Sequence, residues 1–209
     1  MEQLVAPDEM RLVDGLRARD EAAFVELMRR YGASMLRVAQ LYVRSRAVAE
    51  EVVQETWLAV LNGIGRFEGR SSLKTWLFRI LTNTAKTRAV REGRSVPFSA
   101  LGDEDEEGAA VDPDRFLGPD SRFPGHWSAP PERWEGPEDR LLAGEALDLI
   151  AAEIEKLPPA QALVITMRDV EGFDSEEVRN ALEISETNQR VLLHRARSKV
   201  RRALEEYFG

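Results

Sequence analysis

Apolar residues recur every three or four positions through two long stretches of this chain, and neither stretch has the alternation that marks a β-strand. This spacing lines up apolar side chains along one face of a helix, which must then pack against other helices. The first stretch extends from Asp8 to about Arg94, and the second from about Glu138 to Phe208. The pattern therefore predicts an all-α protein with two small helical domains.

Residues with special backbone preferences indicate where the helices of the first stretch begin and end. Asp8 and Asp20 stand immediately before apolar repeats, so both are expected to be N-caps. Gly32 is expected to separate two helices. A later helix is expected to begin at Ser71 or Ser72.

The second stretch contains a candidate helix-turn-helix. Asp174 is placed to cap a short helix over residues 175–182, and Glu177 stands where a capping box requires it. The turn Glu183–Ser185 then leads to a last helix capped by Ser185. Two helices joined by so short a turn are typical of DNA-binding domains.

Residues 96–137, between the two stretches, are rich in proline, which disfavours helix and sheet alike. They also contain the acidic run Asp103–Glu107, so we expect an extended, self-repelling linker between a domain of residues 1–95 and a domain of residues 138–209. Its aromatic residues either dock on a neighbouring domain or engage a partner when the chain assembles. They are Phe116, Phe123, Trp127 and Trp134.

The formal net charge of -8, taken alone, argues against a nucleic-acid partner. The charge is unevenly distributed, however. Residues 66–99 hold eight basic and two acidic side chains, and residues 190–209 hold six and two. Residues 100–140 hold four basic and twelve acidic side chains, a deficit equal to that of the whole chain. Two basic blocks in an acidic background therefore favour nucleic-acid binding despite the average.

The chain has no cysteine and only two histidines, so disulfides, thiolate metal sites and a histidine-based metal centre are not expected. The first residues lack the basic and apolar regions of a signal peptide, and no apolar run is long enough to span a membrane. We expect a soluble cytoplasmic protein with no membrane insertion, no catalytic residue, no metal and no cofactor.

One basic block lies on the last helix, where Leu193, Ala196 and Val200 share an apolar face and basic side chains cover the rest. This could be the solvated face of a packed helix. As the second helix of a helix-turn-helix, it would instead meet base edges and phosphates in a major groove. The candidates for these contacts are Ser185, Thr187, Asn188, Gln189, Arg190, His194, Arg195 and Arg197.

The other basic block, residues 66–94, mixes cationic, aromatic and small polar residues. Such mixtures suit single-stranded nucleic acid, because bases stack on aromatic rings while Lys and Arg follow the backbone. The alternative is that Phe67, Trp76 and Phe78 are core residues. The loop before the helix contains Gly69 and two serines, and is small enough to form a pocket for a flipped base.

Glu50, Glu51, Gln54 and Glu55 fall on one side of a predicted helix. An acidic helix face is usually solvated. The alternative is a docking surface for a basic partner helix.

Motifs in both stretches carry a family resemblance. The first stretch contains Ala47-Val-Ala-Glu-Glu-Val-Val-Gln-Glu-Thr-Trp and Arg66-Phe-Glu-Gly-Arg-Ser-Ser-Leu-Lys-Thr-Trp-Leu-Phe-Arg-Ile. The second contains Leu157-Pro-Pro-Ala-Gln, Arg168-Asp-Val-Glu-Gly-Phe, Glu176-Glu-Val and His194-Arg-Ala-Arg. The two sets resemble regions 2 and 4 of the extracytoplasmic-function (group 4) sigma factors, members of the sigma-70 family of bacterial RNA polymerase.

The resemblance implies a promoter-specificity subunit, not an enzyme, that binds core RNA polymerase and promoter DNA and initiates transcription of a stress- or envelope-type regulon. Region 2 would dock on the coiled coil of the β′ subunit through the acidic face at 50–55. It would also capture an extruded base of the −10 element. The residues implied in −10 binding are Phe67, Arg70, Ser71, Ser72, Lys74, Trp76, Arg79, Asn83, Lys86 and Arg88.

Region 4 would contact the β flap and read the −35 element as duplex with the last helix, again by resemblance. The linker would thread toward the active-site and RNA-exit region of the polymerase, where its acidity would mimic nucleic acid. An anti-sigma factor is the partner implied for the inactive state.

The last helix departs from the family pattern between residues 187 and 192. Gln189 stands where the family has a core-facing Val, and Leu192 stands where it has Arg. We expect Asn188 and Gln189 to read purine edges, and Val191 and Leu192 to contact thymine methyl groups. The −35 sequence preferred by relatives is therefore not transferred to this chain.

A rival interpretation is a helix-turn-helix repressor or activator that binds duplex operators unaided, with the first domain as a sensor or dimerisation module. A scaffolding protein is a third. The aromatic and basic block at residues 66–88 favours the sigma factor, because a duplex-only regulator has no need of it. A scaffold leaves both basic blocks unexplained.

Overall fold

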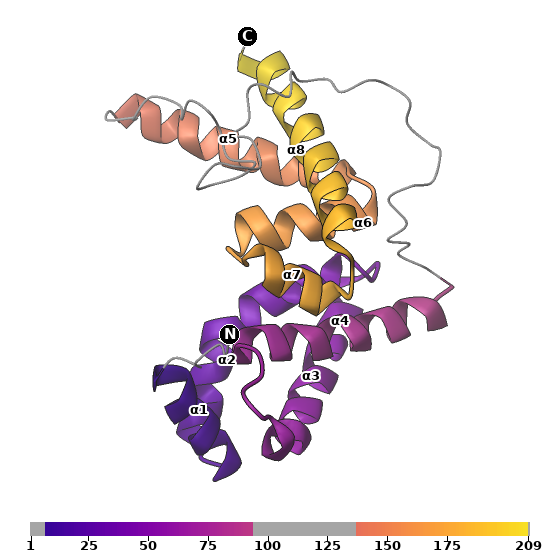
Figure 1. The fold of residues 1–209 in the computed structure, drawn as a ribbon. Helices are drawn as coiled ribbons and strands as arrows, with labels where there is room; N and C mark the ends of the chain where they lie inside the picture. The colour runs from indigo at the N-terminus through magenta and orange to yellow at the C-terminus, as the bar shows by residue number, and fades with distance from the viewer. Residues whose placement is uncertain (1–6, 94–136, 209) are drawn as a thin grey trace.

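The computed structural model describes residues 7–93 and 137–208. All the regular secondary structure within these two ranges is helical (Figure 1). The first range contains α1 (Pro7–Arg17), α2 (Glu21–Gln40), α3 (Arg46–Gly63), the 3₁₀ helix η1 (Ile64–Arg66) and α4 (Leu73–Arg91). The second contains α5 (Pro137–Lys156), α6 (Pro159–Ile165), the π-helical turn η3 (Thr166–Val170), α7 (Ser175–Leu182) and α8 (Glu186–Phe208). The prediction of an all-α fold is confirmed. The expectations for the linker fall on residues that lie outside the described ranges.

Several helix starts lie where the sequence predicts them. Asp20, Ser72 and Asp174 each accept a hydrogen bond from a backbone N–H two or three residues further on, so all three are N-caps. Asp174 and Glu177 form the complete capping box. Ser185 Oγ accepts from the backbone N–H of Asn188 at 3.2 Å, which caps α8.

Two predictions about helix ends are wrong. Asp8 is not an N-cap, because α1 begins one residue earlier, at Pro7, and Asp8 stabilises the positive end of the helix from within its first turn. Gly32 does not break a helix, because α2 continues through it. Leu27, Tyr31, Met35 and Val38 lie buried on one face of α2, and their burial outweighs the cost of about 1 kcal/mol for a helical glycine.

The helices of the first range pack around a shared apolar core. Leu27, Met35, Val52 and Leu77 are fully buried in it. Here α4 packs along α3 and also contacts α2, so one of its faces is inside this bundle. Another side of α4 contacts α7 of the second range.

The helices of the second range form a smaller bundle in which α8 packs on α5 and α6 (Figure 1). The predicted apolar face of the last helix is confirmed, since Ala196 and Val200 are buried against Ile154 and Leu157, with Leu193 packed alongside. After α6, the backbone widens into the π turn, in which the N–H of Glu171 donates to the carbonyl of Thr166 at 2.9 Å.

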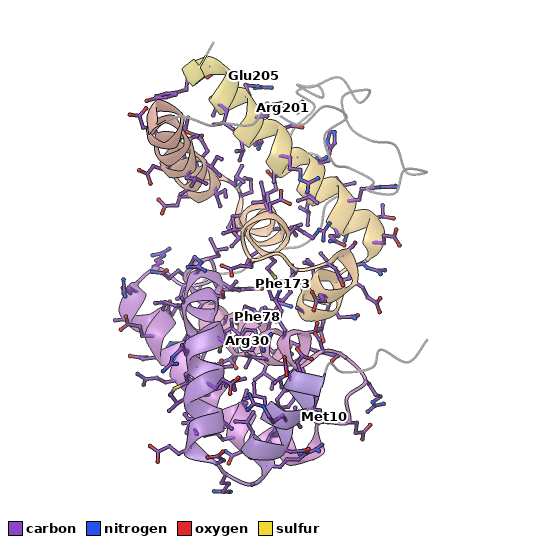
Figure 2. The ribbon with its side chains drawn as sticks, turned by 90° about the vertical axis from the view of Figure 1, so that its left-hand side faces the viewer. Met10, Arg30, Phe78, Phe173, Arg201 and Glu205 are labelled. Atoms are coloured by element: carbon purple, nitrogen blue, oxygen red, sulfur yellow. The ribbon has the colours of Figure 1, made fainter. Side chains whose placement is uncertain are left out.

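The apolar core of the first bundle continues into the second instead of ending at its surface. Phe78 of α4 and Phe173, between η3 and α7, are both buried, and their rings meet edge to face with centroids 4.7 Å apart (Figure 2). Along residues 7–93 and 137–208, no helix has the length and apolar character needed to cross a membrane.

Candidate nucleic-acid interface

The loop between η1 and α4 is shaped by a pair of packed aromatic rings. Phe67 is buried, and its ring lies 5.2 Å from that of Trp76, centroid to centroid. Arg17 of α1 donates to the carbonyl oxygen of Phe67 at 2.6 Å and so fixes the start of the loop. Gly69 has φ of 70°, a left-handed conformation that glycine adopts without strain. This loop is therefore anchored at its start and turns sharply at its centre.

A pocket of about 440 Å³ opens beside this loop, a volume within the range of small-ligand sites. Its walls combine two aromatic residues, three arginines, two hydroxyl groups, a carboxylate and an amide. They are formed by Arg66, Phe67, Glu68, Arg70, Ser71, Thr75, Trp76, Arg79 and Asn180. Asn180 belongs to α7, so the second bundle closes one side of a pocket otherwise built by the first.

The residues predicted for −10 binding are not all placed alike. Arg70 and Asn83 are exposed, Ser71 and Trp76 are half-buried, and Phe67 is buried beneath the loop. Another group contacts the second bundle directly. Its members are Ser72, Lys74, Arg79 and Lys86.

Arg88 faces the acidic side of α3. It forms ion pairs with Glu51, with Glu55 at 3.9 Å and with Glu92 at 3.5 Å. Glu51 and Glu55, which are predicted to dock on polymerase, therefore both pair with Arg88, which is predicted to bind DNA. The sequence places these residues in separate motifs, and only the packing of α4 on α3 brings them together.

The acidic face of α3 is exposed as predicted. Glu50, Glu51, Gln54 and Glu55 all face solvent, and Arg46 donates to Glu50 at 2.9 Å. Leu58 continues this face with 61% of its surface exposed. The surface thus combines negative charge with an exposed apolar residue.

The exposed start of α8 carries Thr187, Arg190 and, further along, His194. Gln189 is placed differently, because it is 3% exposed and its Oε1 accepts from the hydroxyl of Ser175 at 2.8 Å. The expectation that Gln189 reads a base edge is therefore wrong. Its side chain fastens α8 to α7, from the position where the family has an apolar core residue.

The expectation that Leu192 contacts a thymine methyl group is also wrong, since Leu192 is buried and Val191 packs against the same core. Arg197 makes a bidentate ion pair with Asp169 of η3, at 2.7 and 2.8 Å. Arg201, in the same basic block, is buried. Part of the positive charge of α8 is thus used inside the domain.

Two lysines of α4 are partly removed from water. Burial lowers the pKa of Lys74, although Glu177 and Glu171 oppose the change. Burial likewise lowers the pKa of Lys86, against the influence of Glu183. Desolvation is the larger effect in both cases because both amines lie between the two bundles.

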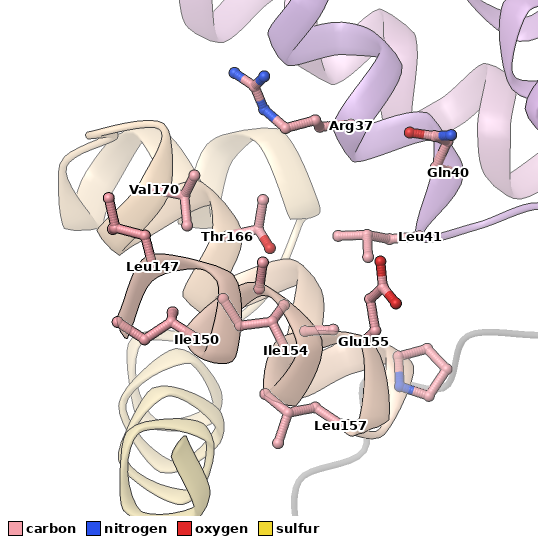
Figure 3. Close-up of a pocket in the computed structure, with 13 residues that line it drawn as sticks. Arg37, Gln40, Leu41, Leu147, Ile150, Ile154, Glu155, Leu157, Thr166 and Val170 are labelled. Carbon is pink, nitrogen blue, oxygen red and sulfur yellow. The ribbon is translucent and has the colours of Figure 1, made fainter. Parts of the chain in front are cut away.

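A second hollow lies between α2 and the helices α5 and α6, with a volume of about 470 Å³ (Figure 3). Leu41 faces it from the first bundle, and Ile150 and Ile154 face it from the second. Leu147 and Val170, at its edge, are 66% and 51% exposed. We call this hollow the interdomain groove.

Sequence reasoning missed the residues that join the bundles. Glu171 and Phe173 belong to the motif Arg168-Asp-Val-Glu-Gly-Phe, and Glu177 belongs to Glu176-Glu-Val. Both motifs resemble region 4, and that resemblance carries no sign of a contact with the first bundle. The only signal was the presence of a large aromatic residue, Phe173, in a short polar turn.

A helical fold that combines a helix-turn-helix with an adjoining aromatic, basic pocket defines a class of protein, the helical DNA-binding transcription factors. Family models narrow this class. Residues 27–95 match the model described as Sigma-70 region 2, and residues 147–200 match the model described as Sigma-70, region 4.

Similar proteins agree with the two models. RNA polymerase sigma-H factor of Pseudomonas aeruginosa is 28% identical over 202 residues, which cover 97% of this chain and 96% of that protein. ECF RNA polymerase sigma-E factor of Escherichia coli K12 is 29% identical over 189 residues, 90% of each chain. The chain belongs to the sigma-70 family, as an extracytoplasmic-function sigma factor. It is a promoter-specificity subunit of RNA polymerase, not an enzyme.

Solved structures share the fold. CnrH, in complex with the cytosolic domain of CnrY, matches with a TM-score of 0.58 at 19% identity, over 95% of this chain and 97% of that one. The sigma factor RpoE from Bartonella quintana, in complex with the anti-sigma factor NepR, matches with a TM-score of 0.55 at 19% identity, over 87% and 96%.

Proposed function

We propose that the loop at residues 67–72 and the exposed side of α4 bind the melted −10 strand, and that the start of α8 reads the −35 duplex. The observation that carries the first assignment is the pocket of about 440 Å³ beside Trp76, with Arg70 and Arg79 in its walls. An aromatic face and cations around a hollow fit a base stacked out of the strand with its phosphates neutralised. The protein acts in the cytoplasm, where polymerase and DNA meet, on a stress- or envelope-type regulon.

The first experiment is run-off transcription with purified core polymerase on a panel of genomic promoters. Transcripts that depend on this protein supply the −10 and −35 sequences for every later test. If no promoter responds, the proposed function fails.

The pocket is tested on a promoter found in this way. Trp76→Ala should weaken capture of the melted strand by about 1–3 kcal/mol, and Trp76→Phe, which keeps an aromatic face, should recover most of it. Arg70→Ala should reduce opening, whereas Arg29→Ala removes an exposed arginine of α2 as a matched control. Equal effects of the two arginine variants would argue against the pocket.

We propose that the acidic face of α3 docks on the coiled coil of the β′ subunit, and that region 4 contacts the β flap. The exposure of the four polar residues at 50–55, continued by Leu58, supports the first contact. Glu55→Lys would place a positive charge against the basic partner helix. We expect it to lower the affinity of the protein for core polymerase by about tenfold or more. Glu26→Lys, on an exposed part of α2, is the matched control, and equal loss in both variants would contradict the assignment.

We also propose that an anti-sigma factor holds this protein inactive by covering the interdomain groove. Its apolar lining and the exposed Leu147 and Val170 support this, and the similar RpoE from Bartonella quintana is bound to an anti-sigma factor in its solved structure. Leu147→Asp should raise transcription from a dependent promoter in the native cell while run-off activity with purified components is unchanged. Met10→Asp, at an exposed apolar residue of α1, is the control. An unchanged cellular transcript level would contradict the proposal.

A further inference from the structure

Helix α1 contacts both ends of the loop at residues 67–72, the loop proposed to capture a base. Arg17, in the last turn of α1, donates from Nη2 to the carbonyl oxygen of Phe67 at 2.6 Å. Glu9, in the first turn, accepts at Oε2 from the backbone N–H of Leu73 at 3.4 Å. One helix therefore holds the residue that begins the loop and the residue that follows it (Figure 2).

The position of α1 is itself fixed by packing. Leu12, Val13 and Leu16 are at most 2% exposed, and they line the face of α1 that also carries its two loop contacts. This face packs on the first bundle, where α1 contacts α2 and η1. A Cβ added at Gly15 would lie only 2.7 Å from the Cβ of Ala23, so the two helices approach more closely than a larger residue would allow. The helix is thus a firm support for the loop.

The backbone at the start of the loop is held on both sides. Asp14 accepts from Nη1 of Arg17 at 3.3 Å, while Nη2 of the same guanidinium reaches the carbonyl of Phe67. The backbone N–H of Phe67 donates in turn to the carbonyl of Ile64 at 3.1 Å. A short hydrogen bond from a guanidinium is charge-assisted and therefore among the stronger kinds. Arg17 consequently fixes the direction in which the chain enters the loop.

The contact at the end of the loop uses the N-terminus of α4. The first N–H groups of a helix have no acceptor within the helix, and this end carries a partial positive charge. Ser72 Oγ accepts from the backbone N–H of Thr75 at 3.1 Å, and Glu9 accepts from that of Leu73. The start of α4 therefore has one cap from its own segment and a second, negatively charged acceptor from α1.

The two contacts reach the pocket through the loop that they hold. The ring of Phe67 packs on that of Trp76, with centroids 5.2 Å apart, and both residues line the pocket. Among the residues that the structure describes, the pocket walls include neither Arg17 nor Glu9. A binding site works only when its parts are held within about 0.5 Å of the productive geometry. A shift at either end of the loop would therefore alter the space beside Trp76.

From these contacts we infer that Arg17 and Glu9 are positioning residues for base capture: α1 sets the geometry of the loop, and thereby the base that the pocket accepts. The inference rests on the function proposed for the loop. Because both residues act through the loop, their loss should change which base is preferred. A partly unfolded protein would instead lose affinity for every base by the same factor, since only the fraction of active molecules falls.

The test uses holoenzyme assembled with purified core polymerase, and single-stranded oligonucleotides of the −10 sequence identified by run-off transcription. Fluorescence anisotropy gives the affinity for the identified sequence and for its single-base substitutions. The ratio of these affinities at the most selective position measures base discrimination. Arg17→Ala should lower this ratio by about threefold or more, the scale of one hydrogen bond, and Arg17→Lys, which keeps a donor, should recover part of it. Arg11→Ala is the matched control, because it removes a cation of α1 that pairs with Glu26 at 3.4 Å, and it should leave the ratio unchanged.

Glu9 provides an independent test at the other end of the loop. Glu9→Ala should lower the ratio, whereas Glu9→Gln should preserve it, because an amide oxygen can still accept from the N–H of Leu73. Unchanged ratios in Arg17→Ala and Glu9→Ala would overturn the inference, as would an equal loss in Arg11→Ala. If holoenzyme with the unmodified protein does not distinguish the oligonucleotides at all, the proposed function of the pocket fails instead.

Discussion

Glu183, the first residue of the turn of the helix-turn-helix, accepts hydrogen bonds at one carboxylate oxygen from both Nε and Nη2 of Arg79, at 3.1 and 2.7 Å. The two residues are 104 positions apart. Glu183 has φ of 59°, a left-handed conformation that is costly for a residue with a side chain. One residue thus ends α7 and joins α7 to α4.

Removal of the Glu183 charge should weaken the contact between α7 and α4 and release the guanidinium of Arg79 for other anions. We expect Glu183→Gln to raise the affinity of the free chain for a labelled single-stranded DNA of random sequence by about two- to fivefold, the range of an exposed ion pair. Fluorescence anisotropy at low salt measures the change, because salt screens such pairs. Glu186→Gln removes an equally negative and exposed residue of α8 that does not face α4, and an equal gain there would refute the interpretation.

The backbone of the turn gives a second prediction for the same position. Glu183→Gly should be more stable to unfolding than Glu183→Gln by about 1 kcal/mol, since glycine adopts the left-handed conformation without steric cost. Both variants lack the carboxylate, so the difference isolates the backbone. Thermal denaturation measures it, and a lower melting temperature for the glycine variant would show that the turn is not strained.

Neighbouring residues at the start of α8 should behave differently. Arg190 is exposed, and Arg190→Ala should cost about 1–3 kcal/mol in binding to −35 duplex while leaving stability nearly unchanged. Gln189→Ala should instead lower the free energy of unfolding. It deletes a buried side chain and removes the acceptor of the hydrogen bond from the hydroxyl of Ser175. Base preference at the −35 element, measured by competition with substituted duplexes, should be unchanged in Gln189→Ala. A changed base preference would show that the side chain of Gln189 does contact the −35 bases.

Tyr42 gives a prediction that concerns stability alone. Its side chain is fully buried in the first bundle, its hydroxyl has no hydrogen-bond partner among residues 7–93 and 137–208, and burial raises the pKa of that hydroxyl. Tyr42→Phe removes the unsatisfied group and keeps the ring, so we expect a gain of about 1 kcal/mol. Urea denaturation measures this, and a less stable variant would mean that the hydroxyl is satisfied in solution.

Much of the local structure could be predicted from the sequence because it depends on neighbouring residues. Asp174 and Glu177 satisfy backbone groups within their own helix, and Ser185 caps α8 in the same way. The apolar face at 193–200 follows from helical spacing. Gly32 was predicted wrongly because the burial of Tyr31 and Met35, a tertiary effect, overrides the local preference of glycine.

The candidate site was predictable only in outline. Motifs indicated which residues are candidates for binding, and the acidic face at 50–55 is exposed, as either of its two interpretations requires. They could not indicate that Gln189 is buried, since the rotation of α8 against α7 decides which side of the helix faces inward. Nor could they indicate that Arg88 meets Glu51, because that pairing requires α3 and α4 to pack side by side.

Short spacings along the chain encode most of the helices, the helix-turn-helix, the family motifs and the caps at Asp20, Ser72, Asp174 and Ser185. Which charges are available depends instead on the tertiary structure. Lys74, Arg79 and Lys86 form a basic stripe in the sequence, but in the folded chain each contacts a group of region 4. The reason is physical: local periodicity fixes which residues share a helix face, whereas the partner of that face is chosen by burial and charge between segments about a hundred residues apart.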